Sequence, residues 1–289
     1  MSTDATDAAP RDAGPGGARE RAHAVVTGLG AGPWRLDRAA VADRLHELVA
    51  NPALIRQGRL NLCGPAALFH VWLGRDPVAA VTYAAELFEH GHARVGELPV
   101  RPSAALIRTP FGRTERERSC AGADWMMMAA LRDSTNRLWP YTRTSGLREA
   151  AAAITTPKVL RRWLRATGLY VDVRDETSLV LRRPMAHVAG LTPTADRDVF
   201  LLVAQEMFRT PATRRRRLRD RTVSLLPNHW VLQRAPLEAD GRTVALRFWS
   251  WGADYQGALE QPVFARCYYG ALVAQARKPD RRIASHEGK

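Results

Sequence analysis

Apolar side chains recur at steps of three and four residues through most of the first half of the chain, the spacing of one helix face. Residues that favour helix starts precede several of these segments, among them Asp37, Asp76-Pro77 and Thr156-Pro157, while Gly91 and Gly168 follow helix ends. The pattern predicts helices over residues 36–50, 63–73, 78–90, 124–136 and 157–167.

The period changes after residue 168, where short runs of β-branched and aromatic residues replace the helical spacing. These runs predict strands at residues 169–173, 178–181, 198–203, 223–232, 243–252 and 264–274. A turn at residues 239–241 joins two of them as a hairpin. The sequence therefore predicts an α+β domain over residues 33–276, with a helical half at 33–168 and a sheet half at 169–276.

The two ends of the chain differ from this domain in composition. Residues 1–32 are rich in Ala, Gly, Asp, Pro and Arg, which predicts a disordered leader, and residues 277–289 read as a basic flexible tail. Residues 1–7 are acidic and contain no apolar core, unlike a secretory signal, and no apolar run is long enough to span a membrane. We expect no membrane partner, and a cytoplasmic protein or one exported without a signal peptide.

The chain of 289 residues carries a net charge of +14, almost entirely from arginine. The densest run is Arg214–Arg219, which can bind phosphates or an acidic partner, although a solvated loop is the commoner meaning of such a run. No helix-turn-helix, zinc-finger or aromatic–basic RNA motif accompanies it. Charge alone therefore does not make this a nucleic-acid-binding protein.

The three cysteines, Cys63, Cys120 and Cys267, are too few and too far apart for a disulfide framework. No CxxC pair is present, and the nearby His90 and His92 have no further ligand close in sequence. We predict no metal and no cofactor. Each thiol is instead judged by its surroundings, and those of Cys120 favour a structural role.

The surroundings of Cys63 are those of a reactive cysteine. It stands directly before an apolar helical run, where backbone N–H groups and the helix dipole favour a thiolate, so we expect a lowered pKa. Gln57, six residues upstream, can donate its side-chain amide to an oxyanion beside the sulfur. The alternative is that Cys63 is a buried core thiol.

The stretch Gln57-Gly58, four residues, Cys63-Gly64 resembles the active-site entry of papain-like cysteine peptidases. The continuation Pro65-Ala66 is more similar to the bacterial peptidase C39-like branch. The resemblance extends in element order over about residues 36–275. It implies a papain-like fold in which the nucleophile opens the central helix of a helical N-terminal half, followed by an antiparallel β-sheet half. It also implies that Gln57 is the oxyanion donor.

A papain-like order requires a histidine at the start of a strand in the sheet half, and His229 occupies such a place. The resemblance implies that His229 pairs with Cys63 as an imidazolium–thiolate ion pair and later protonates the leaving amine. The alternative is an ordinary histidine at the edge of a sheet, and His187 is the rival candidate.

The residue that orients the histidine in papain-like enzymes is replaced in this chain. Papain-like enzymes often carry Asn-Ser-Trp-Gly after the histidine, whereas this chain has Trp249-Ser250-Trp251-Gly252. An indole cannot accept a hydrogen bond from imidazole. The group that orients His229 is therefore Ser250, a backbone carbonyl, or Asp254 just beyond.

These residues predict a cysteine-dependent hydrolase that cleaves amide or peptide bonds in a protein or peptide substrate through an acyl-enzyme. One alternative is a glutamine deamidase or acyl-transferase of the same fold, such as a bacterial toxin or effector. Another is a catalytically inactive papain-like scaffold that binds a partner or nucleic acid through its arginine-rich surface.

Overall fold

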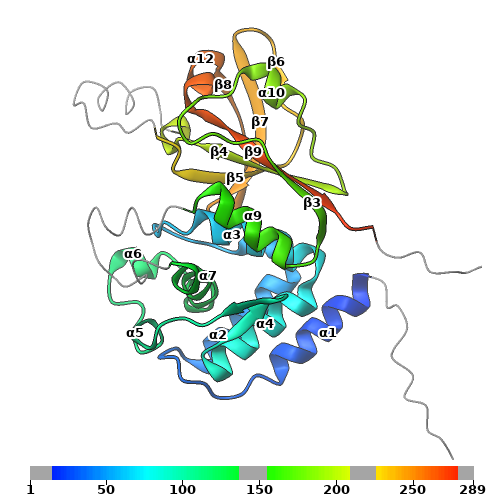
Figure 1. Cartoon of the computed structure of the whole chain (residues 1–289). Coiled ribbons are helices and arrows are strands. Elements are labelled where there is room, and N and C mark those ends of the chain that lie inside the picture. The colour runs from blue at the N-terminus through cyan, green and yellow to red at the C-terminus, as the bar shows by residue number, and fades with distance from the viewer. Residues whose placement is uncertain (1–14, 137–154, 209–225, 279–289) are drawn as a thin grey trace, which may run out of the picture.

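The computed structural model describes residues 15–136, 155–208 and 226–278, and these form a mixed α+β protein (Figure 1). The helical half lies against one side of the sheet half, and α3 (Cys63–Arg75) and α9 (Pro157–Ala166) lie where the halves meet. The predicted mixed class is confirmed.

The longer helices of the first half are α1 (Pro15–Thr27), α2 (Arg38–Ala50), α3, α4 (Pro77–His90) and α7 (Gly122–Thr135). Shorter elements between them are η1 (Pro52–Leu54), β1 (Ala93–Val95), β2 (Leu98–Val100), α5 (Ala104–Ile107) and α6 (Glu115–Arg118). Asp37 and Asp76 cap α2 and α4 by accepting bonds from backbone N–H groups, as their residue types predicted. Helix α3 is buried from Cys63 to Leu73 and packs against α4, α7 and α9, so it forms the centre of this half.

The second half contains a seven-stranded antiparallel sheet. Its strands are β3 (Tyr170–Asp175), β4 (Arg197–Val203), β5 (His229–Gln233), β6 (Glu238–Ala239), β7 (Thr243–Ser250), β8 (Ala253–Glu260) and β9 (Tyr268–Ala276). They follow the order β3-β9-β4-β5-β7-β6, and β8 pairs with β7. Three short helices complete this half: α10 (Met185–Ala189), η2 (Gln205–Phe208) and α12 (Gln261–Cys267). Strand β5 packs directly on α3, which brings the two halves together at the start of that helix.

The prediction of a disordered leader is wrong from residue 15 onward. Residues 15–27 form α1, which packs on α4 and α2 and buries Ala22 and Val26. Most of the helix consists of small and charged residues. The few apolar positions that it buries therefore give no clear helical period in the sequence. The packed domain therefore begins before the predicted boundary at residue 33, while residues 1–14 lie outside the described chain.

Two predicted strands also need correction. Residues 178–181 form an exposed loop, in which the Ser178 hydroxyl accepts bonds from the N–H groups of Val180 and Leu181. Such local bonds compete with strand pairing. The predicted strand at 264–274 instead begins at Tyr268, because Pro262 starts the short helix α12 ahead of it.

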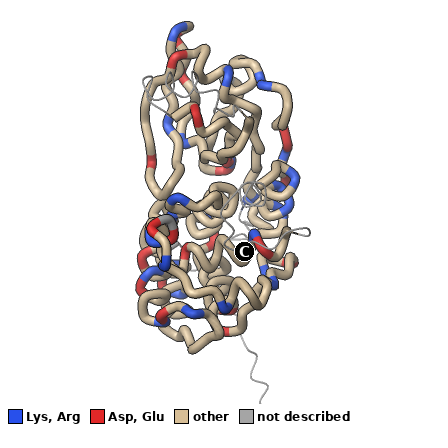
Figure 2. The backbone as a smooth tube through the Cα atoms, turned by 90° about the vertical axis from the view of Figure 1, so that its left-hand side faces the viewer, with Lys and Arg blue, Asp and Glu red and all other residues tan. Residues whose placement is uncertain are grey.

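Charged residues of both signs are interspersed along both halves of the described chain (Figure 2). Several arginines are paired with carboxylates, including Arg44 with Asp124 and Arg75 with Asp198. The run Arg214–Arg219 lies outside the described residues, as does most of the predicted tail. Within the described ranges, no helix is both long and apolar enough to cross a membrane.

Candidate active site

Cys63 is the first residue of α3, and its sulfur lies against the backbone on both sides of His229. Sγ is 3.9 Å from the carbonyl oxygen of Asn228. The N–H groups of Trp230, Gly64 and Cys63 itself favour the ionised form of the sulfur. The structure thus brings together the two residues that the sequence predicted as nucleophile and base, although they are 166 positions apart (229 − 63).

Burial sets the ionisation of this thiol. Cys63 is only 6% exposed, and its loss of hydration raises its pKa, against the lowering effect of the nearby N–H groups and of the Arg132 charge. The predicted fall in pKa at the helix start is therefore wrong. Loss of water outweighs these N–H groups and the Arg132 charge, so the thiol rests in its neutral form.

His229 is the first residue of β5 and is 3% exposed. Its Nε2 lies 2.8 Å from the Ser250 hydroxyl at the end of β7. The Trp251 indole stacks on the imidazole with ring centroids 4.3 Å apart and planes 14° apart, and Phe208 approaches it edge-on. The ring is thus fixed by a polar contact at one nitrogen and by aromatic contacts around it.

Burial also lowers the pKa of His229, to about 3, so the imidazole is neutral at pH 7. Burial of both groups thus works against the predicted resting ion pair between thiolate and imidazolium, because a buried site separates charge only at a cost. Within the described ranges, no hydrogen bond joins Cys63 to His229 or occupies Nδ1 of the imidazole. A neutral imidazole whose Nε2–H is donated to Ser250 keeps Nδ1 free to accept a proton.

Gln57 lies in a loop that is fixed by contacts with other parts of the helical half. Asp124, which pairs with Arg44, also accepts the N–H of Arg56, and the Cys120 thiol donates to the carbonyl of Arg56. Gly58 has φ +56°, and a Cβ there would meet the backbone of Ser119 at 2.5 Å. These contacts fix the loop backbone on both sides of Gln57.

The side chain of Gln57 is 5% exposed, and no hydrogen bond to its amide is found among the described residues. A buried amide with donors to spare can stabilise a developing oxyanion. The structure also assigns Cys120 the structural place expected from the sequence, because that thiol is buried and bonded to the loop.

Trp251 and Gly252 form the two-residue turn between β7 and β8. Both have positive φ, 49° and 83°, as the type I′ hairpin turn requires, and Trp251 is the only non-glycine residue with positive φ in the described chain. A left-handed conformation costs a non-glycine residue about 1–2 kcal/mol. The stacking of Trp251 on His229 offsets this strain.

Trp249, which replaces the family's asparagine, has a different position. Its indole donates to the carbonyl of Ala53 in η1 at 2.9 Å and stacks on His70 with ring centroids 4.3 Å apart. It thus ties the β7–β8 hairpin to the helical half. Ser250, one residue later, is the side chain of this motif that reaches His229.

The two rival residues lie elsewhere. Asp254 pairs with Arg234 at 3.0 Å and has a largely exposed side chain. His187 lies 2.8 Å from the hydroxyl of Tyr268 and 3.0 Å from a carboxylate oxygen of Glu176. Neither belongs to the cluster around Cys63, so the structure brings Ser250 to His229 and leaves both rivals outside.

Thr155 was not singled out by the sequence, yet it covers the start of α3. It is 2% exposed, its carbonyl accepts the Trp230 indole N–H, and a Cβ on Gly64 would collide with its side chain at 2.5 Å. Only glycine at position 64 allows this approach. Like Arg132 and Phe208, Thr155 reaches the site through tertiary folding, and no local motif marks any of the three.

Among the described residues, no group of three or more His, Cys, Asp or Glu side chains is placed to bind a metal ion. Comparisons with protein-family models, with curated proteins and with solved structures found no match. The structure itself is that of a mixed α+β protein with a buried cysteine–histidine–serine cluster between its two halves.

Proposed function

We propose that this protein is a papain-like cysteine hydrolase that cleaves amide or peptide bonds. The observation that carries the proposal is the position of the Cys63 sulfur against the backbone on either side of His229, whose imidazole is held by Ser250 and Trp251. A thiol and an oriented imidazole are the pair that acyl transfer through cysteine requires.

The proposed reaction begins from the neutral pair. Nδ1 of His229 accepts the thiol proton as the Cys63 sulfur attacks the amide carbon, and the carbonyl oxygen becomes an oxyanion. The Gln57 amide and the Cys63 N–H stabilise that oxyanion. Starting from neutral groups means that charge separates only when a substrate carbonyl is present to receive the electron pair.

Collapse of this intermediate breaks the C–N bond, and His229 gives the proton to the departing amine. A thioester on Cys63 remains. Water then attacks the thioester while His229 takes a proton from it, and the carboxylic acid leaves as the proton returns to the sulfur. Ser250 keeps the imidazole in one orientation throughout, and Arg132 adds a positive charge that favours the thiolate.

The strained turn supports an enzyme over an inactive scaffold. Backbone strain at Trp251 persists only where surrounding structure enforces it, and such strain gathers at functional sites. Deamidase and acyl-transferase activities would use the same residues and differ in the amide attacked and in the acceptor of the acyl group. The product identifies which of the three reactions occurs.

The test is to incubate the protein with a denatured proteome. New peptide termini, released ammonia and new amide links are then measured by mass spectrometry. We expect Cys63→Ala to lose at least about a thousandfold in rate, the scale seen when a nucleophile is removed. Cys267→Ala is the matched control, because Cys267 is equally buried but is the last residue of α12, outside the cluster around Cys63. Equal activity of wild type and Cys63→Ala would refute the proposal, and no product of any kind from wild type would favour the scaffold.

A further inference from the structure

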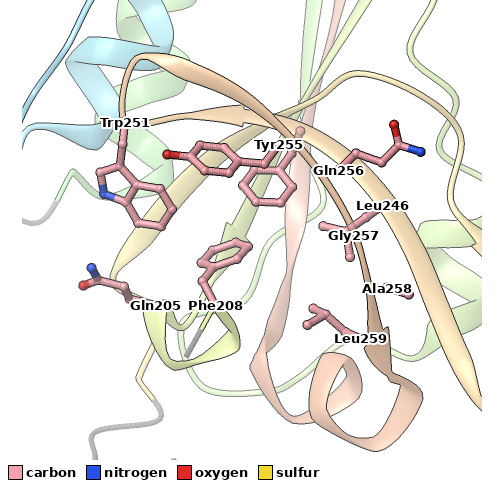
Figure 3. A pocket seen from close by; sticks show the side chains of 10 residues that line it. Gln205, Phe208, Leu246, Trp251, Tyr255, Gln256, Gly257, Ala258 and Leu259 are labelled. Carbon is pink, nitrogen blue, oxygen red and sulfur yellow. The ribbon is translucent and has the colours of Figure 1, made fainter. Parts of the chain in front are cut away.

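An aromatic cavity of about 440 Å³ opens on the side of Trp251 away from the helical half (Figure 3). It is bounded by the β7–β8 hairpin and by η2. Its apolar walls are Phe208, Leu246, Phe248, Trp251, Tyr255 and Leu259. Gln205 and Gln256 also line it, and both are exposed.

The cavity is joined to the candidate active site through a shared ring. Trp251 stacks on His229 and also meets Phe208 and Tyr255 edge-on, with ring centroids 5.3 Å and 5.9 Å away. Phe248 extends this wall by stacking against Tyr255. Whatever occupies the cavity therefore contacts the ring that holds the imidazole in place.

One of the lining residues is a glycine, Gly257, with open space in front of it. In the β7–β8 register Gly257 pairs with Leu246, and Tyr255 pairs with Phe248, so these residues face the same side of the hairpin. A Cβ at Gly257 would meet no atom within 4 Å. A larger residue at this position would fill the cavity without displacing the protein around it.

From this cavity we infer a substrate preference, which rests on the proposed hydrolase function. We propose that it binds a large apolar or aromatic side chain on the leaving-group side of the scissile amide. His229 delivers the proton to the leaving amine, so the leaving fragment lies beside His229 and next to Trp251. None of the lining residues within the described chain is charged, which disfavours an ionised side chain there.

The size and polarity of the cavity agree with this occupant. Its volume falls within the roughly 300–1,000 Å³ typical of binding pockets. Aromatic walls bind aromatic rings by offset or edge-on contacts. The amide of Gln205 can bond to the backbone of the leaving fragment, since Gln205 is exposed beside the apolar walls.

The test compares wild type with Gly257→Val and with Arg247→Val, a matched exchange at an exposed position on the opposite face of the same hairpin. Each protein digests a denatured proteome, and the first residue of every new amino terminus is read by mass spectrometry. In wild type and Arg247→Val we expect Phe, Tyr, Trp and Leu to exceed Ala by about tenfold to a hundredfold. In Gly257→Val this preference should collapse while cleavage before Ala persists. An unchanged preference in Gly257→Val would overturn the proposal.

A binding measurement separates failure of this proposal from failure of the hydrolase function. Saturation-transfer NMR on the Cys63→Ala protein compares L-phenylalaninamide with L-alaninamide, and we expect the first to bind and Gly257→Val to abolish its signal. Binding without any cleavage by wild type would sustain the cavity assignment and refute the enzyme. Cleavage through Cys63 without binding and without an aromatic preference would refute the cavity assignment and sustain the hydrolase function.

Discussion

Two histidines in this protein occupy similar surroundings and differ in one respect. His70 stacks on Trp249 and His229 stacks on Trp251, both with ring centroids 4.3 Å apart, and both are nearly buried. Burial lowers the pKa of each, to about 4 for His70 and about 3 for His229. Aromatic stacking and a lowered pKa therefore do not distinguish a catalytic histidine from a structural one.

The difference lies in what surrounds the ring nitrogens. His70 Nδ1 lies 3.1 Å from the carbonyl of Pro52, which can only accept a hydrogen bond, so its proton is fixed on that nitrogen. His229 bonds a hydroxyl, which can donate or accept, and the Cys63 sulfur lies against the backbone on either side of it. Two neighbouring tryptophans on β7 and its turn thus hold one histidine that locks η1 in place and one that can exchange a proton.

Replacing the two histidines one at a time should give the largest contrast between them. We expect His229→Gln to lower the rate of amide cleavage by at least about a hundredfold, the usual contribution of a general acid–base. His70→Gln should retain activity within about threefold, because His70 takes no part in the proposed reaction. Steady-state kinetics on the same peptide pool measures both. A larger loss from His70→Gln than from His229→Gln, at equal folded fraction by circular dichroism, would reverse the two roles.

The lowered pKa values of His70 and His229 also make the stability of the fold depend on pH. Both pKa values are lower folded than unfolded, so between pH 6.5 and about 4 the unfolded chain binds more protons. Stability is therefore fully present above pH 6.5 and falls as the pH drops towards these values. At pH 4.5, two units below the ordinary histidine pKa, each histidine should cost about 3 kcal/mol. Urea unfolding at pH 7 and pH 4.5 measures the loss, which should shrink in either glutamine variant; an unaltered loss in both would contradict it.

The Ser250 contact should matter less than the imidazole itself. Ser250→Ala leaves a buried ring nitrogen without its partner, which should cost about 1–3 kcal/mol of stability. We expect a drop of about tenfold in cleavage rate, mainly in kcat, because the imidazole can then adopt the wrong tautomer. Ser250→Thr, which keeps the hydroxyl, should restore part of this loss. Wild-type kcat in Ser250→Ala would show that another group orients His229.

Asp254 gives the smallest expected effect and isolates the role of Ser250. Its pair with Arg234 is largely exposed, and such pairs contribute at most about 1 kcal/mol. Asp254→Asn should therefore leave both kcat and the unfolding midpoint almost unchanged. A hundredfold loss of kcat would instead make Asp254 the orienting residue.

Much of the helical half was accessible from sequence, because capping residues and apolar spacing are local signals. Asp37 and Asp76 cap the helices for which they were predicted. Helix α1 was missed because its buried face is narrow, and the strand at 178–181 was wrongly expected because apolar residues there are exposed. The spacing of apolar residues shows where a buried face can form. Only tertiary packing decides which of these apolar positions are covered.

The candidate site was predictable in its members and not in its electrostatics. Cys63, His229 and Ser250 were chosen through the resemblance to papain-like peptidases, and the structure brings them into one cluster. The pKa of Cys63 was expected to fall because the helix start is a local feature of the chain. Its rise comes from burial where α3 packs on β5, and no local pattern encodes that packing.

The central claim is that Cys63 becomes acylated with His229 as its base. The most direct measurement is acid-quenched mass spectrometry after brief mixing with a peptide pool, followed by digestion to locate any thioester. The account predicts a peptide thioester on Cys63 in wild type and in His70→Gln, and none in His229→Gln or Cys63→Ala. A thioester on Cys120 or Cys267, or an equal yield on Cys63 without His229, would contradict it.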